Sequence, residues 1–549
     1  MTVHVPSSDV QPCRYETEAN ELINGLVREP WGRVSPSAYE TARLVAVAPW
    51  LTGHASRVAY LLANQRTDGG WGGPGGYALV PTLSAADAVL SALVRRPDGV
   101  APAVLARSAD RALGMLARLI PGLDANDVPD TPAVDMITAS LVGSIGARLR
   151  VLRDAPSTDV GRVADWTPPP LPAGIDRRRL DAMLAALDAG LPLQMKLFHA
   201  LEVAGPAASG AAGAAPAPTG AIGAAPAATA AWLGERGPAD PGHPARRFLE
   251  AVGQRHRGPV PCGIPITVFE RSWVISSLLR AGLSPAVPAG LAAELAAAVG
   301  PHGSPAAAGL PADADTTAVA LYTLSLLGVK RTPDALWRYE TETHFCTWPG
   351  EDGHSTSVNA HILDAFGQYL RDVSREASTA NPRTVHRAAT SVRKISSWLC
   401  DRQHMDGSWR DRWHASPYYA TACCALALSD FGGGGAREAV ARAVRWVLAT
   451  QRPDGSWGAW SGTAEETAYA IQTLSLAGAP SDDATERALT NGRRSLISSA
   501  EAARHPALWH DKDLYLPTAV VEAGILAALY LADRRLSTGT GDSVRPGTA

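Results

Sequence analysis

The sequence has little lysine, and its charges nearly cancel. Only four of its 50 basic residues are lysines, and 53 acidic residues leave a formal net charge of −3. Surfaces that bind nucleic acid or anionic membranes carry an excess of positive charge. The composition therefore argues against a nucleic-acid partner.

Cysteine is also scarce, and long apolar runs are lacking. The six cysteines form no C-x-x-C pair, and Cys423 and Cys424 are adjacent. This pattern favours reduced, buried thiols over a disulfide framework or a zinc site. No apolar run reaches the ~18 residues of a membrane span, and residues 1–30 lack the pattern of a signal peptide. We therefore expect a cytoplasmic protein without a membrane span.

What the sequence does have is length and a large apolar fraction. Its 549 residues are 46% hydrophobic and 19% charged, which predicts a globular chain of two domains. Residues 204–230 are low-complexity Ala, Gly and Pro, and we expect a flexible insertion loop there.

A seven-residue motif recurs three times. "QRTDGGW" (65–71), "QHMDGSW" (403–409) and "QRPDGSW" (451–457) share the pattern Q-x-x-D-G-[GS]-W, and each follows an amphipathic stretch of helical period. Asp-Gly favours a turn, and the tryptophan is large enough to anchor the next helix. The repeats predict stacked helical hairpins, an all-α repeat architecture.

Two aspartates, Asp313 and Asp315, precede an apolar stretch in "LPADADTTAVALYTL" (310–324). By itself a D-x-D pair at the start of a helix is most simply an N-terminal cap on the surface. The alternative is a buried carboxyl pair with a chemical role.

Several longer stretches resemble the class II terpene cyclases. The repeats resemble the QW repeats of squalene–hopene-type cyclases, although protein prenyltransferase β-subunits use a similar helical toroid. "SPSAYETARLVA" (35–46), "FERSWVISSLLRAGLS" (269–284) and "DADTTA" (313–318) are similar, in order and spacing, to motifs of class II diterpene cyclases. Thr316 replaces the last Asp of D-x-D-D, as in a bacterial D-x-D-T-T subgroup that includes halimadienyl (tuberculosinyl) and drimenyl diphosphate synthases.

The resemblance implies a two-domain (βγ) α/α-barrel fold. Residues 1–50 would be the N-terminal segment of the β domain, and 51–265 an inserted γ domain that contains the 204–230 loop. Residues 266–535 would form the main β domain and 536–549 a flexible tail.

The resemblance also implies a reaction that starts by protonating an alkene, a very weak base. Burial keeps a carboxyl protonated, and two adjacent carboxyls cannot ionise independently. Asp315 would be the proton donor and Asp313 its support, and Asn359 in "STSVNAHIL" would hydrogen-bond the acid or simply cap a helix. The substrate would be geranylgeranyl or farnesyl diphosphate, the former preferred because most matched motifs belong to diterpene cyclases. The product would be a bicyclic labdane-, halimane- or drimane-type diphosphate.

Aromatic faces would stabilise the carbocation that follows protonation. The candidates are Trp273, Trp348 and Trp409, with Trp413 and Tyr418 nearby. Core packing is the alternative role for each.

The diphosphate needs metal or basic partners. Asp124 and Asp127 in "LDANDVPDTPAVD" (123–135) match an acidic E-D-x-x-D stretch whose leading Glu is here Leu123, and Asp135 matches a later Glu. Carboxylates shared with phosphate are typical Mg²⁺ ligands, so Mg²⁺ is the expected cofactor; a solvated acidic loop is the alternative. Lys196, Arg412 and Lys512 are the predicted anion partners.

Three other interpretations stay open: a squalene-type cyclase, a prenyltransferase β-subunit-like protein, and a helical scaffold without activity. "SDDATE" (481–486) superficially matches a class I metal motif but is typical of an acidic helix N-terminus. A phosphatase or a class I terpene synthase could act downstream on a cyclised diphosphate.

Overall fold

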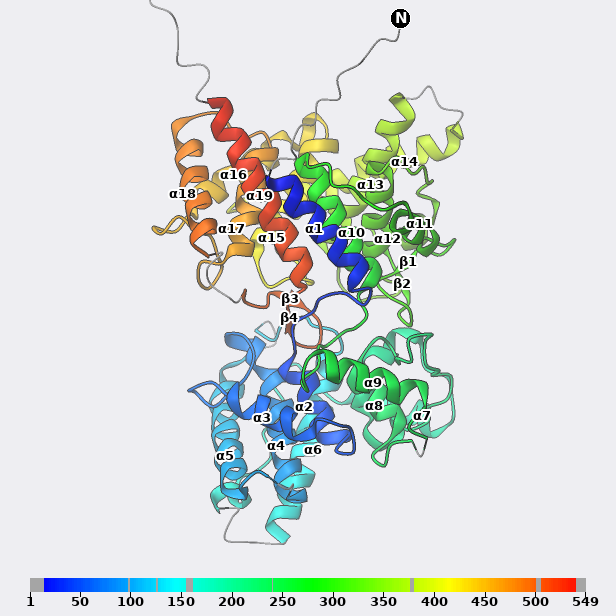
Figure 1. Cartoon of the computed structure of the whole chain (residues 1–549), viewed down its shortest axis with the longest axis vertical. Helices are drawn as coiled ribbons and strands as arrows, with labels where there is room; N and C mark the ends of the chain where they lie inside the picture. Colours follow the sequence, from blue (N-terminus) through cyan, green and yellow to red (C-terminus); the bar gives the residue numbers. More distant parts are fainter. Residues whose placement is uncertain are drawn as a thin grey trace, which may run out of the picture.

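The chain folds into two helical lobes, one above the other in Figure 1. The structure is a computed structural model, and it describes residues 14–96, 99–124, 127–154, 161–238, 240–375, 380–499 and 505–539. One lobe, here called the barrel lobe, contains α1 and α10 to α19. The other, here called the insert lobe, contains α2 to α9.

Six helices form a closed ring at the centre of the barrel lobe. Around the ring each helix packs on the next, and the last packs on the first. In ring order they are α10 (Thr267–Ala281), α12 (Ala314–Leu326), α13 (Thr356–Arg375), α15 (Pro417–Phe431), α17 (Ala464–Leu476) and α19 (Thr518–Gly539). These helices are largely buried because both their inner and outer faces are covered. The ring is the α/α barrel that the resemblance implied, and it agrees with the all-α repeat architecture predicted from the repeats.

A second layer of helices covers the ring from outside. Each outer helix packs on one or two neighbouring ring helices, with α1, for example, lying against α10 and α19. The outer elements are α1 (Arg14–Arg28), α11 (Ala289–Ala298), η5 (Asp334–Tyr339), α14 (Pro382–Asp401), η6 (Gly434–Ala436), α16 (Arg437–Ala449) and α18 (Asp483–Ser499).

The insert lobe is built around α4 (Leu79–Arg95), which packs against α2, α5 and α6. Its other elements are α2 (Ala38–Val47), α3 (His54–Ala63), η1 (Gly75–Ala78), α5 (Pro102–Leu119), η2 (Ile120–Gly122), α6 (Val134–Asp154), η3 (Gly161–Asp165), α7 (Arg178–Asp188), η4 (Met195–Ala208), α8 (Pro226–Leu233) and α9 (Pro244–Arg255). Gly75–Arg95 is the one stretch of the described residues long and apolar enough to cross a membrane, and 89% of its most apolar window is buried in this lobe.

The three Q-x-x-D-G-x-W motifs form the same contacts, which explains why the same spacing of Gln, Asp, Gly and Trp recurs in each. Each tryptophan indole N–H donates to a carbonyl ten residues earlier, at 2.8, 2.8 and 2.7 Å for Trp71, Trp409 and Trp457. Each glutamine amide donates to the carbonyl of the glycine four residues later. The motif therefore fastens the end of one helix to the following turn, as predicted for a packing anchor.

A short hairpin joins the two lobes. Strand β3 (Trp509–His510) pairs antiparallel with β4 (Leu514–Tyr515), and Figure 1 shows this hairpin between the lobes. Beside it, the backbone of residues 33–35 bonds to residues 516–518 at the start of α19. A second hairpin, β1 (Ser304–Pro305) with β2 (Ala312–Asp313), leads into α12 and sets Ser304 opposite Asp313.

Three boundary predictions were wrong in detail. Helix α2 packs on α4 and α8, so residues 38–50 lie with the insert lobe and not with the barrel. Residues 204–230 are not a flexible loop: part of η4 and of α8 falls there, and Ala225, Ala227 and Ala228 are fully buried because small side chains permit close packing. Residues 536–539 of the predicted tail continue α19, and residues 540–549 lie outside the described residues.

Candidate active site

Asp313 is the buried N-cap of α12. Its Oδ1 accepts the Thr316 backbone N–H at 2.6 Å, and its Oδ2 accepts the Thr316 hydroxyl at 3.0 Å. Thr316, the residue that departs from D-x-D-D, therefore supports the first aspartate. Burial raises the pKa of Asp313 to about 7; the Thr316 hydrogen bonds oppose this rise and the charge of Asp315 adds to it. Asp313 therefore caps α12, but as a buried carboxyl and not on the surface; its chemical role stays a prediction.

Asp315 is held by a histidine. Its Oδ1 lies 2.6 Å from Nδ1 of His361, on α13. Burial alone would lower the pKa of His361, but the Asp315 carboxylate outweighs it and raises that pKa well above its usual range. The imidazole is therefore cationic and stabilises the charge that Asp315 would carry after losing a proton.

Asn359 does not hydrogen-bond the acid, contrary to prediction. Its side-chain oxygen accepts the Phe345 N–H at 2.9 Å, and its amide donates to the carbonyls of Phe345 and Ser355. Asn359 is fully buried and braces the loop before α13. The acid's partner is His361, two residues further along the same helix, and a helix turns by about 200° over two residues.

Aromatic side chains cluster close to the acid. The Trp273 ring lies 4.4 Å from Phe269 and 5.4 Å, edge to face, from the His361 ring. The Trp273 indole N–H donates to the Tyr419 hydroxyl, and the Tyr419 ring lies 4.8 Å from Trp509. The structure therefore brings Trp273 to the acid, with Phe269, Tyr419 and Trp509 as partners that the sequence did not single out.

The other two predicted tryptophans lie elsewhere in the lobe. Trp409 is fully buried and makes the packing contacts of its repeat motif, so its predicted role in cation stabilisation is wrong. Trp348 packs edge to face on Trp413, with ring centroids 5.4 Å apart. Tyr418 likewise packs on Trp446 of α16, outside the ring.

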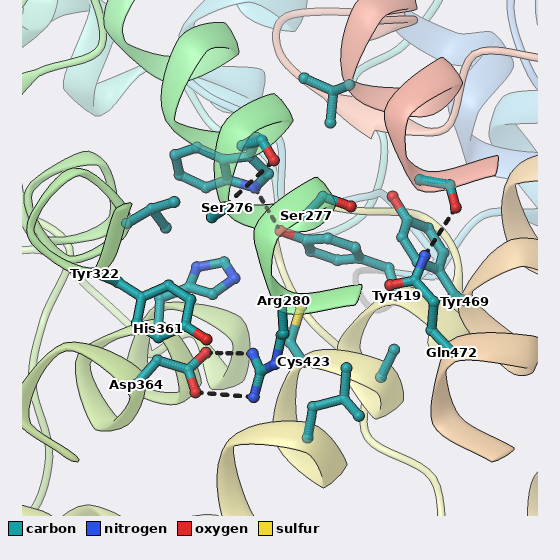
Figure 2. A pocket seen from close by; sticks show the side chains of 16 residues that line it. Ser276, Ser277, Arg280, Tyr322, His361, Asp364, Tyr419, Cys423, Tyr469 and Gln472 are labelled. Atoms are coloured by element: carbon teal, nitrogen blue, oxygen red, sulfur yellow. Dashed lines mark hydrogen bonds and ion pairs between the residues drawn. The ribbon is translucent and has the colours of Figure 1, made fainter. Parts of the chain in front are cut away.

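A cavity of about 100 Å³ lies inside the ring of helices, next to His361. Figure 2 shows its lining, in which Arg280 pairs with Asp364 across the cavity from Tyr419, Tyr469 and Gln472. The lining includes Trp273, His361 and Cys423 but neither Asp313 nor Asp315. His361 thus stands between the acid and this cavity.

A second histidine–aspartate pair lies where the lobes meet, and the sequence analysis missed it. His199 Nε2 is 2.7 Å from Asp511 Oδ1, and His199 Nδ1 is 2.7 Å from the Gly223 carbonyl. Tyr515 lies within electrostatic range of both Asp511 and Asp315, whose charges add to the effect of burial in raising its pKa. His199 lies three residues after Lys196 in "QMKLFHALE" (194–202), so an ionisable residue close to a predicted anion partner was the available signal.

Comparisons with known proteins agree with this geometry. Residues 352–494 match the family model described as "Squalene-hopene cyclase C-terminal domain". An ent-copalyl diphosphate synthase of a Streptomyces species is 40% identical over 521 residues, covering 94% of this chain and 96% of that protein. Labda-7,13-dienyl diphosphate synthase of Streptomyces clavuligerus is 41% identical, covering 96% and 94%. The chain belongs to the class II terpene cyclases.

A solved structure supports the same membership. The structure of ent-copalyl diphosphate synthase from Streptomyces platensis matches the structure of this chain with a TM-score of 0.87. The two sequences are 43% identical, and the match covers 94% of this chain and 99% of the Streptomyces platensis chain. Matches along nearly the whole of both chains argue against the prenyltransferase β-subunit, squalene-cyclase and scaffold alternatives.

Lys512 of the cyclase is a buried structural residue, contrary to its predicted role in binding the diphosphate. Its Nζ lies 2.9 Å from Glu40 Oε2 and 2.9 Å from Glu202 Oε1, and it donates to the His199 carbonyl. The two carboxylates raise the pKa of Lys512 against the effect of burial. Its ammonium group has no donor left for a substrate.

The two other predicted cations lie nearer the surface. Arg412 pairs with Asp130 of the insert lobe at 2.8 Å and donates to the Asp352 carbonyl, so it bridges the lobes. The Lys196 side chain is exposed at the start of η4.

Asp124 and Asp127 are exposed on the loop that also carries Asp130. Asp127 Oδ2 accepts the Asp124 backbone N–H at 3.0 Å, which leaves its other oxygen for a cation. Asp135 is instead paired with Arg179, with 3.6 Å between Asp135 Oδ2 and Arg179 Nε. In the described part of the chain no three His, Cys, Asp or Glu side chains are grouped to hold a metal ion. An Mg²⁺ ion that is shared with a diphosphate takes only one or two protein carboxylates, and Asp124 and Asp127 can supply these. They are too few to enclose the ion with protein ligands alone.

Proposed function

We propose that this cyclase converts geranylgeranyl diphosphate to a bicyclic diphosphate by protonating the terminal double bond. The observation that carries the proposal is the buried Asp313 beside the partly exposed Asp315, with His361 bound to the second aspartate. Relatives named for copalyl and labda-7,13-dienyl diphosphates match along nearly their full length, which supports the C20 substrate.

The acid works because the two aspartates hold one proton between them. Burial and the neighbouring Asp315 charge raise the pKa of Asp313 to about 7, so Asp313 holds its proton up to near neutral pH. The cationic His361 stabilises the Asp315 carboxylate that protonation of the alkene leaves behind, which makes the acid stronger in the transition state. Asp313 caps α12 through Thr316, and this contact fixes the position of its carboxyl group.

The carbocation then needs neighbouring side chains that stabilise its positive charge without reacting with the cation. The faces of Trp273, Phe269 and Trp509 supply this, each contributing about 0.5–2 kcal/mol through its quadrupole. None of these rings carries a nucleophile strong enough to trap the cation.

The reaction ends when the bicyclic cation loses a proton or captures water. We assign the proton acceptor to His199, either directly or through a water molecule. The Asp511 carboxylate raises the pKa of His199 despite its burial, so the imidazole is a better base than a free one. Tyr515 feels the charge of the acid, Asp315, and of Asp511, which holds the base.

The diphosphate group remains on the product and needs its own partners. Asp124 and Asp127 would hold Mg²⁺, which when bound neutralises phosphate charge. Arg412 would donate to the phosphate oxygens by releasing Asp130, and Lys196 adds a positive charge on the surface. A phosphatase or a class I synthase would consume the product, and we keep the cytoplasm as the proposed location.

Side-by-side incubation with geranylgeranyl and farnesyl diphosphates plus Mg²⁺ tests the proposal. After phosphatase treatment, mass spectrometry should find a bicyclic C20 alcohol from the wild type and none from Asp315→Ala. His361→Gln should lower kcat by about 10²–10³-fold, as expected for a lost charge-stabilising group, whereas the exposed His404→Gln serves as control. A wild type that returns both substrates unchanged would refute the function; a C15 product alone would refute the chain length.

A further inference from the structure

We propose that Cys423 is a site of covalent modification by small electrophiles, and that its modification switches off the catalytic acid. The proposal rests on the proposed function for its effect on activity. Its chemical part, the reaction of the thiol, stands on the cavity and on the contact between Cys423 and His361.

Cys423 belongs to a chain of three interacting groups. His361 contacts Asp315 through Nδ1 at 2.6 Å, and its ring also interacts with the Cys423 thiol. Asp315, His361 and Cys423 come from three neighbouring ring helices, α12, α13 and α15. An imidazole held by a carboxylate next to a thiol is the arrangement that activates cysteine nucleophiles.

The thiol also faces open space. Cys423 and His361 both line the cavity inside the ring, and Figure 2 shows the Cys423 sulfur among the lining side chains. The volume of about 100 Å³ is well below the ~300–1,000 Å³ of pockets for drug-sized ligands, so the cavity suits a molecule of a few heavy atoms. It has no room for a C15 or C20 chain.

The other described thiols lack this combination. Cys262, Cys346 and Cys424 are buried, and Cys424 donates to the Thr356 carbonyl at 3.7 Å. Cys400 is partly exposed like Cys423, but it lies on the outer helix α14 and away from the cavity. Exposure and a neighbouring imidazole therefore coincide at Cys423.

The chemistry is addition to an electron-poor alkene, such as an α,β-unsaturated carbonyl compound. The thiolate is the nucleophilic form of cysteine, and a cationic neighbour stabilises it. The Cys423 sulfur forms a bond to the β-carbon, the carbon–carbon π bond breaks, and the α-carbon receives a proton. The thiol releases its proton to solvent, the His361 imidazolium donates one to the α-carbon, and His361 then regains a proton from solvent, so no oxidant or further reactant is needed.

Modification disables the acid through His361. An adduct on Cys423 fills the cavity beside the imidazole and removes the thiol from its ring. The ring then moves or loses its charge, and Asp315 loses the partner that stabilises its carboxylate. We expect cyclase activity to fall at least tenfold when Cys423 is fully modified.

N-ethylmaleimide is the probe that tests both parts. Peptide mass spectrometry of the labelled wild-type protein should find Cys423 modified before Cys400, and activity should fall in step with labelling of Cys423. Cys400→Ser, the matched control at the other thiol that is partly exposed among the described residues, should remain sensitive. The activity left in Cys423→Ser should resist the reagent.

Labelling rates separate the geometry from the function. His361→Gln should slow labelling of Cys423 at least fivefold, a readout that requires no cyclase activity. Three results would each overturn the proposal. They are equal rates of Cys423 labelling in His361→Gln and wild type, faster labelling of Cys400 than of Cys423, and full labelling of Cys423 without loss of activity. A wild type without cyclase activity would refute the proposed function, and the labelling results would still stand.

Discussion

Replacing Lys512 by methionine should destabilise the protein by about 3–5 kcal/mol, the usual cost of removing one partner from a buried ion pair. The Lys512, Glu40 and Glu202 side chains are all 0–1% exposed. Methionine fills much the same volume, so the cost comes from two carboxylates left without a counter-charge. If the whole chain unfolds together, a loss of this size corresponds to a fall in Tm of about 3–4 °C.

The loss should depend on pH. Burial raises the pKa of Glu40 to about 7, and Lys512 opposes that rise. Without Lys512 the pKa of Glu40 rises further, so the folded variant keeps a proton that the unfolded chain releases near its ordinary pKa. Stability of the variant therefore falls as pH rises through this window, and the difference from wild type should be larger at about pH 8 than at about pH 5.5.

Thermal unfolding of Lys512→Met beside wild type and Lys196→Met measures this. The exposed Lys196→Met variant should stay within about 0.5 kcal/mol of wild type. Adding Glu202→Gln to Lys512→Met should recover part of the loss, because one uncompensated carboxylate is removed. An unchanged Tm in Lys512→Met, together with a large rise in KM, would refute the structural role and restore the diphosphate-binding prediction.

Three further results follow from the site. Cyclase kcat should fall as pH rises through about 7, where Asp313 loses its proton; a rate flat from about pH 6 to 9 would contradict a role for the Asp313 proton in the reaction. Asn359→Ala should cost about 2–4 kcal/mol in unfolding free energy, since it leaves buried backbone groups of Phe345 and Ser355 unpaired; unchanged stability with lost activity would favour a direct role in proton transfer. Trp409→Phe should lower stability by about 1–3 kcal/mol and leave the product unaltered, and a changed product would restore the predicted role of Trp409 in cation stabilisation.

The all-α repeat architecture could be predicted from the sequence because it depends on local patterns. The Q-x-x-D-G-x-W motif makes its contacts within ten residues or with the next helix, so its spacing alone predicts the repeat. Asp313 caps α12 through Thr316, three residues away, and the D-x-D-T-T stretch specifies this contact by itself.

Contacts between distant segments were decided only by the tertiary structure. Asp315 meets His361 across 46 residues, and Lys512 meets Glu40 and Glu202 across hundreds, so no spacing in the sequence reports either pair. The choice of His361 over Asn359 depends on how α13 is rotated in the ring, because the two residues point to different sides of that helix. Residues 204–230 were also mispredicted, because their composition is typical of a loop. Burial by surrounding helices, and not local preference, fixes the alanines of this segment in the insert lobe.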